Sequence, residues 1–141
     1  MMKFSQCGGV ALVRVVTGGV FLLEGLLKFV DPVNLGAGRF AKIGLPMPEF
    51  LAIFDGSFEI LCGTLLIFGL LTRLAAIPMI INMVVAILTT KLPMLMQAGF
   101  WKAAHEARLD FTMLCCCIFL VCVGSGGMSL DSWFCSHKKK N

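Results

Sequence analysis

Acidic and basic side chains stand inside otherwise apolar stretches of this sequence, and their types and spacing could do chemistry. The candidates for binding a ligand or a proton are Arg14, Glu24, Lys28, Asp55, Glu59, His105, Glu106 and Asp110. A charged side chain at the centre of a bilayer costs about 2.5–3.5 kcal/mol on insertion scales, so each needs a partner, a cavity or an interface. Carboxyl groups beside cations in a polar pocket suit proton transfer, a quinone head group or a small anion.

Glu59 has the most distinctive position among these residues. In the second apolar stretch it lies about 13 Å from the nearer end, whereas Asp55 lies only about 7 Å from that end, at 1.5 Å per helical residue. No cation stands within one helical turn of Glu59 in the same stretch. A carboxyl group that changes between charged and neutral forms is what proton coupling requires. The alternatives are a carboxyl that stays protonated and one that is fixed on Arg14.

The same charges also have a structural interpretation, which the sequence leaves open. Glu24 and Lys28 are four residues apart and would pair on one face of a helix. The other acids would pair with Arg108, with Arg14 or with cations in the loops. A third interpretation is that unrelated charged side chains reach out to one membrane surface.

The composition indicates the kind of protein that must position these side chains. Hydrophobic residues make up 58% of the 141 residues and charged residues 14%, where soluble domains carry about 25% charged residues. This excludes a disordered chain, a disulfide-knotted secreted domain and an ordinary soluble enzyme. It predicts an all-α membrane protein, a single domain over residues 1–141 whose main partner is the lipid bilayer.

Four apolar stretches are long enough to be predicted as transmembrane helices in a bundle. They lie at about 8–30, 50–71, 74–90 and 109–123. The loops between them are expected to carry two short interfacial helices, at about 35–43 and 100–108. Four spans place both termini on one side of the membrane. The short charged segments there, including a basic tail at 132–141, favour the cytoplasm.

Each predicted span carries one polar stripe, and the stripes should converge inside the bundle. The stripes are Arg14, Thr17, Glu24 and Lys28 on the first span, Asp55 and Glu59 on the second, Asn82 and Thr89 on the third, and Asp110 and Cys117 on the fourth. The glycines that border the first two stripes are Gly18, Gly25, Gly56 and Gly63. Small residues at such positions let two helices approach closely.

Metal, thiol and nucleic-acid chemistry have weaker support. His105 and Glu106 are adjacent, so they point about 100° apart on a helix and predict no metal site. The three consecutive cysteines at 115–117 diverge in the same way and fit as small apolar filler; Cys62 and Cys117 are the better placed thiols. Nucleic-acid binding is not expected, because no basic helix or aromatic platform accompanies the lysine tail.

Several short motifs follow one another at characteristic separations. They are Arg14 with GGVFLLEGLLK at 18–28, GLPMP at 44–48, Glu59 with Gly63, GLLTRLAA at 69–76, HEARLDFTML at 105–114 and GSGGMSLD at 124–131. Together they resemble the DoxX family, over about residues 13–131. The resemblance implies a four-helix protein of the bacterial inner membrane that takes part in redox work. Some family members resemble a subunit of thiosulfate:quinone oxidoreductase, and others anchor soluble redox and sulfur-transfer proteins. The family that the chain resembles has no settled catalytic motif, so the resemblance assigns no catalytic residue.

Three functions therefore stay open. The first is a membrane component of a redox system that binds a quinone in a polar pocket or anchors soluble redox or sulfur-transfer partners. The second is a small proton-coupled transporter, which would work as a homo-oligomer, and the third is a non-catalytic scaffold or assembly factor. The sequence holds no haem ligation pair, nucleotide-binding loop or nucleophile motif. An oxidoreductase role would therefore need a bound quinone or a partner to carry the electrons.

Overall fold

The computed structural model describes residues 2–133, with side chains from residue 8 onward, and every regular element in that range is helical. The elements are α1 (Met2–Val30), α2 (Ala37–Lys42), α3 (Pro48–Phe68), α4 (Thr72–Ala86), the π-helix η1 (Ile87–Lys91), α5 (Leu92–Ala98) and α6 (Phe100–Val123). The predicted all-α class is confirmed. Most of the predicted basic tail and Cys135 lie outside the described residues.

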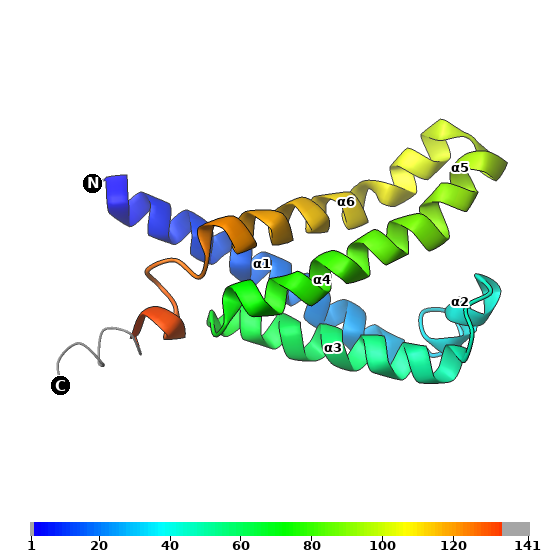
Figure 1. Ribbon diagram of the computed structural model, residues 1–141, viewed down its shortest axis with the longest axis horizontal. Helices are drawn as coiled ribbons and strands as arrows, with labels where there is room; N and C mark the ends of the chain where they lie inside the picture. Colours follow the sequence, from blue (N-terminus) through cyan, green and yellow to red (C-terminus); the bar gives the residue numbers. More distant parts are fainter. Residues whose placement is uncertain (1, 134–141) are drawn as a thin grey trace.

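The four long helices form two antiparallel pairs (Figure 1). α1 packs along α3, and α4 packs along α6. The pairs converge at the end where α3 turns into α4, and they splay apart at the end that carries α2 and α5 (Figure 1). The bundle is therefore a wedge, open toward the α2 and α5 end.

Glycines determine how closely α1 and α3 approach each other. A Cβ atom on Gly18 would lie 2.6 Å from the carbonyl oxygen of Gly63, and one on Gly25 would lie 2.7 Å from that of Gly56. These pairs are spaced by seven residues on each helix, which is about two turns. In lipid the hydrophobic effect does not drive helices together, so close backbone packing replaces it. The prediction that these glycines permit close approach is confirmed.

The outer surface of the bundle is apolar, whereas its core is small. Phe21, Leu66, Met79 and Leu120 are fully buried between the helices. Large hydrophobic residues are exposed along the outer faces of all four long helices. Soluble monomers rarely expose contiguous apolar patches of this extent, so the natural surroundings of these faces are lipid.

Three of the described helical stretches are long and apolar enough to cross a membrane. They are Gly8–Val30, Pro48–Phe68 and Thr72–Ala98. The first two agree closely with the predicted spans. The third extends past its predicted end at Thr90, because η1 and α5 continue the helix where a loop was expected. Lys91 does not end it, since its charge is paired with Asp110.

α6 differs from the prediction in its first turns. The separate interfacial helix expected at 100–108 is instead the start of one continuous helix, because no glycine or proline interrupts the sequence between Gly99 and Gly124. α6 is about 36 Å long at 1.5 Å per residue. Its first half carries Lys102, Glu106, Arg108 and Asp110, so it lacks the apolar composition of the other three stretches. Its role as a fourth span stays a prediction. The other predicted short helix is present as α2.

Arg14 closes the converging end of the bundle. It is 4% exposed, and its guanidinium donates hydrogen bonds to the carbonyl oxygens of Ser125 (2.6 Å) and Met128 (2.7 Å). Asp131 accepts a hydrogen bond from the backbone N–H of Leu71 (3.1 Å). These bonds fasten the segment that follows α6 to α1 and to the turn between α3 and α4.

Candidate functional site

A pocket of about 590 Å³ lies between the two helix pairs. Its walls come from α1, α2, α3, α4, η1 and α6, and they are largely apolar. Six of the predicted site residues line it: Glu24, Lys28, Asp55, Glu59, Glu106 and Asp110. Arg14 and His105 do not. The predicted convergence of polar stripes therefore occurs in part, at the splayed end of the bundle, since Arg14, Thr17 and Cys117 of those stripes do not line the pocket.

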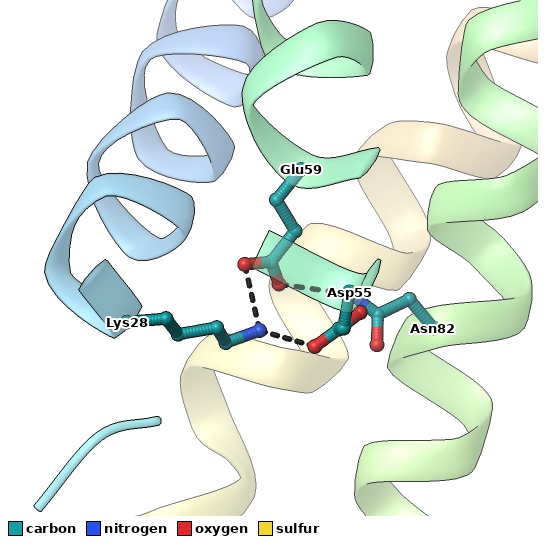
Figure 2. A network of polar contacts seen from close by, with 4 residues as sticks. All are labelled: Lys28, Asp55, Glu59 and Asn82. Carbon is teal, nitrogen blue, oxygen red and sulfur yellow. Dashed lines mark hydrogen bonds and ion pairs between the residues drawn. The ribbon is translucent and has the colours of Figure 1, made fainter. Parts of the chain in front are cut away.

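Four polar side chains from three helices meet in this pocket (Figure 2). Lys28 on α1 donates to the carboxylate of Asp55 and, at 2.7 Å, to Oε2 of Glu59, both on α3. Asn82 on α4 donates to Oε1 of Glu59 at 2.8 Å. We name Lys28, Asp55, Glu59 and Asn82 the Lys28 cluster. Glu59 is its most enclosed member, with a side chain that is 3% exposed.

Helical geometry explains why these residues meet. Asp55 and Glu59 are four residues apart, so they share one face of α3. Lys28 lies in the last turn of α1, where the helix dipole favours a cation. The close packing of Gly25 against Gly56 brings the two backbones near enough for Lys28 to reach both carboxylates.

Two pairings that the sequence leaves open are not among the described ion pairs. Lys28 forms its described ion pairs across helices rather than with Glu24 on its own helix. The physical reason is that Glu59 is buried whereas Glu24 is only partly buried, and a buried carboxylate without a cation is strongly destabilising. Glu59 is likewise not fixed on Arg14, which is occupied by carbonyl groups at the opposite end of the bundle.

A second ion pair lies in the same pocket. Nζ of Lys91 is 3.5 Å from Oδ2 of Asp110, and the two side chains are 9% and 18% exposed. Lys91 ends the π-helix η1, whose wider turn changes the direction in which the following side chains point. Oδ2 of Asp110 is buried and makes no hydrogen bond to any described group. It is therefore available to a donor from a ligand or from water.

Asn82 and Lys91 are the functional candidates that the sequence prediction did not include. Asn82 belongs to the predicted polar stripe of its helix but is not among the predicted site residues. It is the only amide side chain in residues 74–90, and that is a usable signal. The sequence predicts a loop at Lys91, because a π-helix has no periodicity that the sequence reveals.

The ionisable groups that line the pocket do not balance in charge. They are five carboxylates (Glu24, Asp55, Glu59, Glu106 and Asp110) and three cations (Lys28, Arg39 and Lys91). The five negative and three positive charges leave a formal excess of two negative charges. In a medium of low dielectric constant this excess disfavours anions and favours a proton, a cation or a neutral hydrogen-bonding ligand.

The remaining candidates lie apart from this arrangement. His105 is exposed, and its ring nitrogen Nδ1 is 2.9 Å from the guanidinium of Arg108. Among the described residues, no group of three His, Cys, Asp or Glu side chains is placed to hold a metal ion. Cys62 and Cys117 are buried free thiols outside the pocket lining.

Comparison with known proteins gives a match to one family of membrane proteins. The model of the DoxX family matches residues 9–92, a region that contains the whole Lys28 cluster but not Asp110. An uncharacterized membrane protein of Mycobacterium tuberculosis is 50% identical over 128 residues, which is 86% of this chain and 78% of the relative. CatD of Bacillus subtilis, whose name describes it provisionally as an oxidoreductase, is 34% identical over 131 residues (93% and 90%). An uncharacterized protein of Haemophilus influenzae is 31% identical over 129 residues (88% and 89%). No solved structure matches the chain.

Proposed function

From the premise that this chain belongs to the DoxX family of membrane proteins, we propose that it is a membrane component of a redox system that binds a quinone. The observation that carries the proposal is the Lys28 cluster, a set of hydrogen-bonding groups enclosed in a largely apolar pocket of about 590 Å³. Pockets for small molecules typically combine apolar walls with a few polar groups that fix orientation.

The Lys28 cluster has hydrogen-bond donors to spare. A lysine ammonium has three N–H donors, and Lys28 uses two of them on Asp55 and Glu59. A side-chain amide has two N–H donors, and Asn82 uses one on Glu59. One donor on each residue is therefore available to the carbonyl oxygen of a quinone. The apolar walls would surround the ring and exclude water.

Bound quinone would supply the two-electron chemistry, and this chain would supply binding, orientation and sites for protons. The carboxyl groups of Glu59 and Asp55 lie within the same cluster and could hold the protons that accompany reduction. Electrons would come from a soluble redox or sulfur-transfer partner docked on the membrane surface. The name of CatD adds weak support for a redox role.

We also propose a membrane and an orientation for the chain. The whole chain, residues 1–141, acts as one domain in the bacterial inner membrane. α6 serves as the fourth span, and both termini face the cytoplasm. In this arrangement the pocket opens at the α2 and α5 end of the bundle, toward the surface of the inner membrane that faces away from the cytoplasm.

Asn82→Leu tests quinone binding. The substitution removes one donor to the head group and keeps the size of the side chain, so affinity for a benzoquinone with a decyl tail should fall roughly tenfold, the equivalent of about one hydrogen bond. Binding is measured with the purified protein in lipid nanodiscs. Asn34→Leu is the matched control, because Asn34 is exposed and bonds only to Asp31 among the described contacts. Equal affinity in wild type and Asn82→Leu, or no binding by wild type, contradicts the proposal.

Proton-coupled transport is a second candidate, and the excess of carboxylates in the pocket favours it. A cationic substrate could replace a proton on Glu59, which is the exchange that such transporters perform. Substrate-driven proton movement in liposomes containing the protein would separate this function from quinone binding.

A further inference from the structure

We infer that the ligand enters the pocket sideways from the lipid, through a gap between α3 and α4, and leaves an apolar tail in that gap. This inference rests on the proposed function and specifies its ligand class: an uncharged polar head group on a long apolar tail.

Five apolar residues belong both to the pocket and to the outer surface of the bundle: Leu109 on α6, which is 46% exposed, and four residues on α3 and α4. Phe54 and Phe58 on α3 are 52% and 38% exposed, and Ile81 and Val85 on α4 are 59% and 46% exposed. All four also line the pocket. A side chain that does both marks the edge of an opening. We name these four the portal residues.

Helical register places the portal residues on one side of the two helices. α3 and α4 are antiparallel and are linked by the Glu59–Asn82 hydrogen bond (Figures 1 and 2). Two antiparallel helices are related by a two-fold axis that is normal to the plane containing both helix axes. The residue before Glu59 and the residue before Asn82 therefore point to the same side of that plane. Those residues are Phe58 and Ile81. Phe54 and Val85 are one turn away from them along each helix, toward the α2 and α5 end.

The opening faces lipid because of the helices that form it. α3 and the stretch that begins with α4 are both long and apolar enough to cross a membrane. Phe54 stacks on Phe50 with ring centroids 6.1 Å apart, and it contacts Phe58 at 4.7 Å, so the aromatic edge continues along the outer surface of α3. A molecule that passes between such side chains comes from the hydrocarbon region and needs an apolar portion of its own.

The charges inside the pocket select the head group. Lys28 is shared by two carboxylates, and Lys91 is paired with Asp110. Arg39 also lines the pocket and has no described ion pair, but the same is true of Glu24 and Glu106, so the lining as a whole carries a formal excess of two negative charges. A phospholipid phosphate or a small inorganic anion would therefore meet a net negative site, whereas an uncharged head group with carbonyl oxygens would use the spare donors of the Lys28 cluster.

The experiment compares two probes in neutral phosphatidylcholine nanodiscs: a tritiated benzoquinone with a decyl tail and the same ring without the tail. Ile81→Trp fills the gap, so the tailed probe should associate about tenfold more slowly and bind about tenfold more weakly, within the range for a misfit in an apolar slot. The tailless probe should be little affected. The matched control is Ile77→Trp, because Ile77 is an exposed isoleucine one turn away that does not line the pocket.

A second variant tests the same inference in the opposite direction. Phe58→Ala widens the gap, so the tailed probe should associate faster than with wild type. If Ile81→Trp and Phe58→Ala change neither probe, or change both probes equally, the portal is wrong while quinone binding stands. If the wild type binds neither probe, the proposed function fails and the portal with it. Displacement of the tailed probe by anionic phosphatidylglycerol would overturn the inferred preference for an uncharged head group.

Discussion

Lys28→Met is expected to destabilise the bundle by about 3–5 kcal/mol, the cost of removing one partner from a buried ion pair. Lys28 is the shared cation of two carboxylates whose side chains are only 20% and 3% exposed. Without it, Asp55 and Glu59 would face each other across adjacent turns of α3 with Asn82 as the remaining described donor. The free energy of unfolding can be measured by reversible denaturation in mixed micelles.

A rescue variant separates the charge effect from the loss of a long side chain. Lys28→Met combined with Asp55→Asn and Glu59→Gln removes the unpaired charges, so most of the lost stability should return. Lys42→Met is the control, because Lys42 is an exposed lysine on α2. If Lys28→Met is as stable as Lys42→Met, or if the triple variant is no more stable than Lys28→Met, the cluster does not hold the helices as described.

Gly63→Leu is expected to force α1 and α3 apart, at a cost of about 3 kcal/mol, the upper end of the range for overpacked cores. A Cβ atom on Gly63 would lie 2.7 Å from the carbonyl oxygen of Gly18 and 2.8 Å from the backbone nitrogen of Leu22. Both are backbone atoms, so no side-chain rotation relieves the clash. Because the same helix contact positions Lys28, binding of the tailed quinone should fall as well.

Gly19→Leu is the matched control for this helix contact. Gly19 is on the same helix as Gly18, yet a Cβ atom there would meet nothing within 4 Å. Its substitution should leave both stability and quinone affinity close to wild type. Equal unfolding free energies for Gly63→Leu and Gly19→Leu would mean that the glycine contact does not hold α1 against α3.

The main features of the fold follow from the sequence, because lipid imposes simple rules. Long apolar stretches must be helical, since no water is present to satisfy an exposed backbone. This rule located α1 and α3 well. Charges within apolar helices must face inward, so the polar stripes correctly predicted that Lys28, Asp55 and Glu59 share one region. Glycines at seven-residue intervals indicated which faces of α1 and α3 meet.

The pairing of charges could not be predicted in the same way. Which carboxylate Lys28 reaches depends on how α1 and α3 cross, and helical periodicity carries no information on crossing. For this reason the sequence offers Glu24 as a candidate partner of Lys28 and Arg14 as a candidate partner of Glu59, and it leaves both pairings open. The continuation of the third span through η1 could not be predicted either. A lysine at position 91 indicates the end of a membrane span unless its partner Asp110 is known.

A purely structural role and a binding role for the ion pairs of the pocket make different predictions. A purely structural cluster would use all its donors internally and would be filled by its own side chains. In this chain Lys28 and Asn82 retain spare donors, and about 590 Å³ of the space beside them is unfilled by protein atoms. Both features favour a ligand.

The most direct test of the central claim is to identify the small molecules that accompany the protein from its membrane. Wild type and Asn82→Leu are purified side by side in mild detergent, and lipid-soluble compounds are extracted and analysed by mass spectrometry. A near-stoichiometric quinone is expected with wild type, and a clear loss of it with Asn82→Leu. Wild type that carries only phospholipid, in the same amount as Asn82→Leu, would contradict that claim.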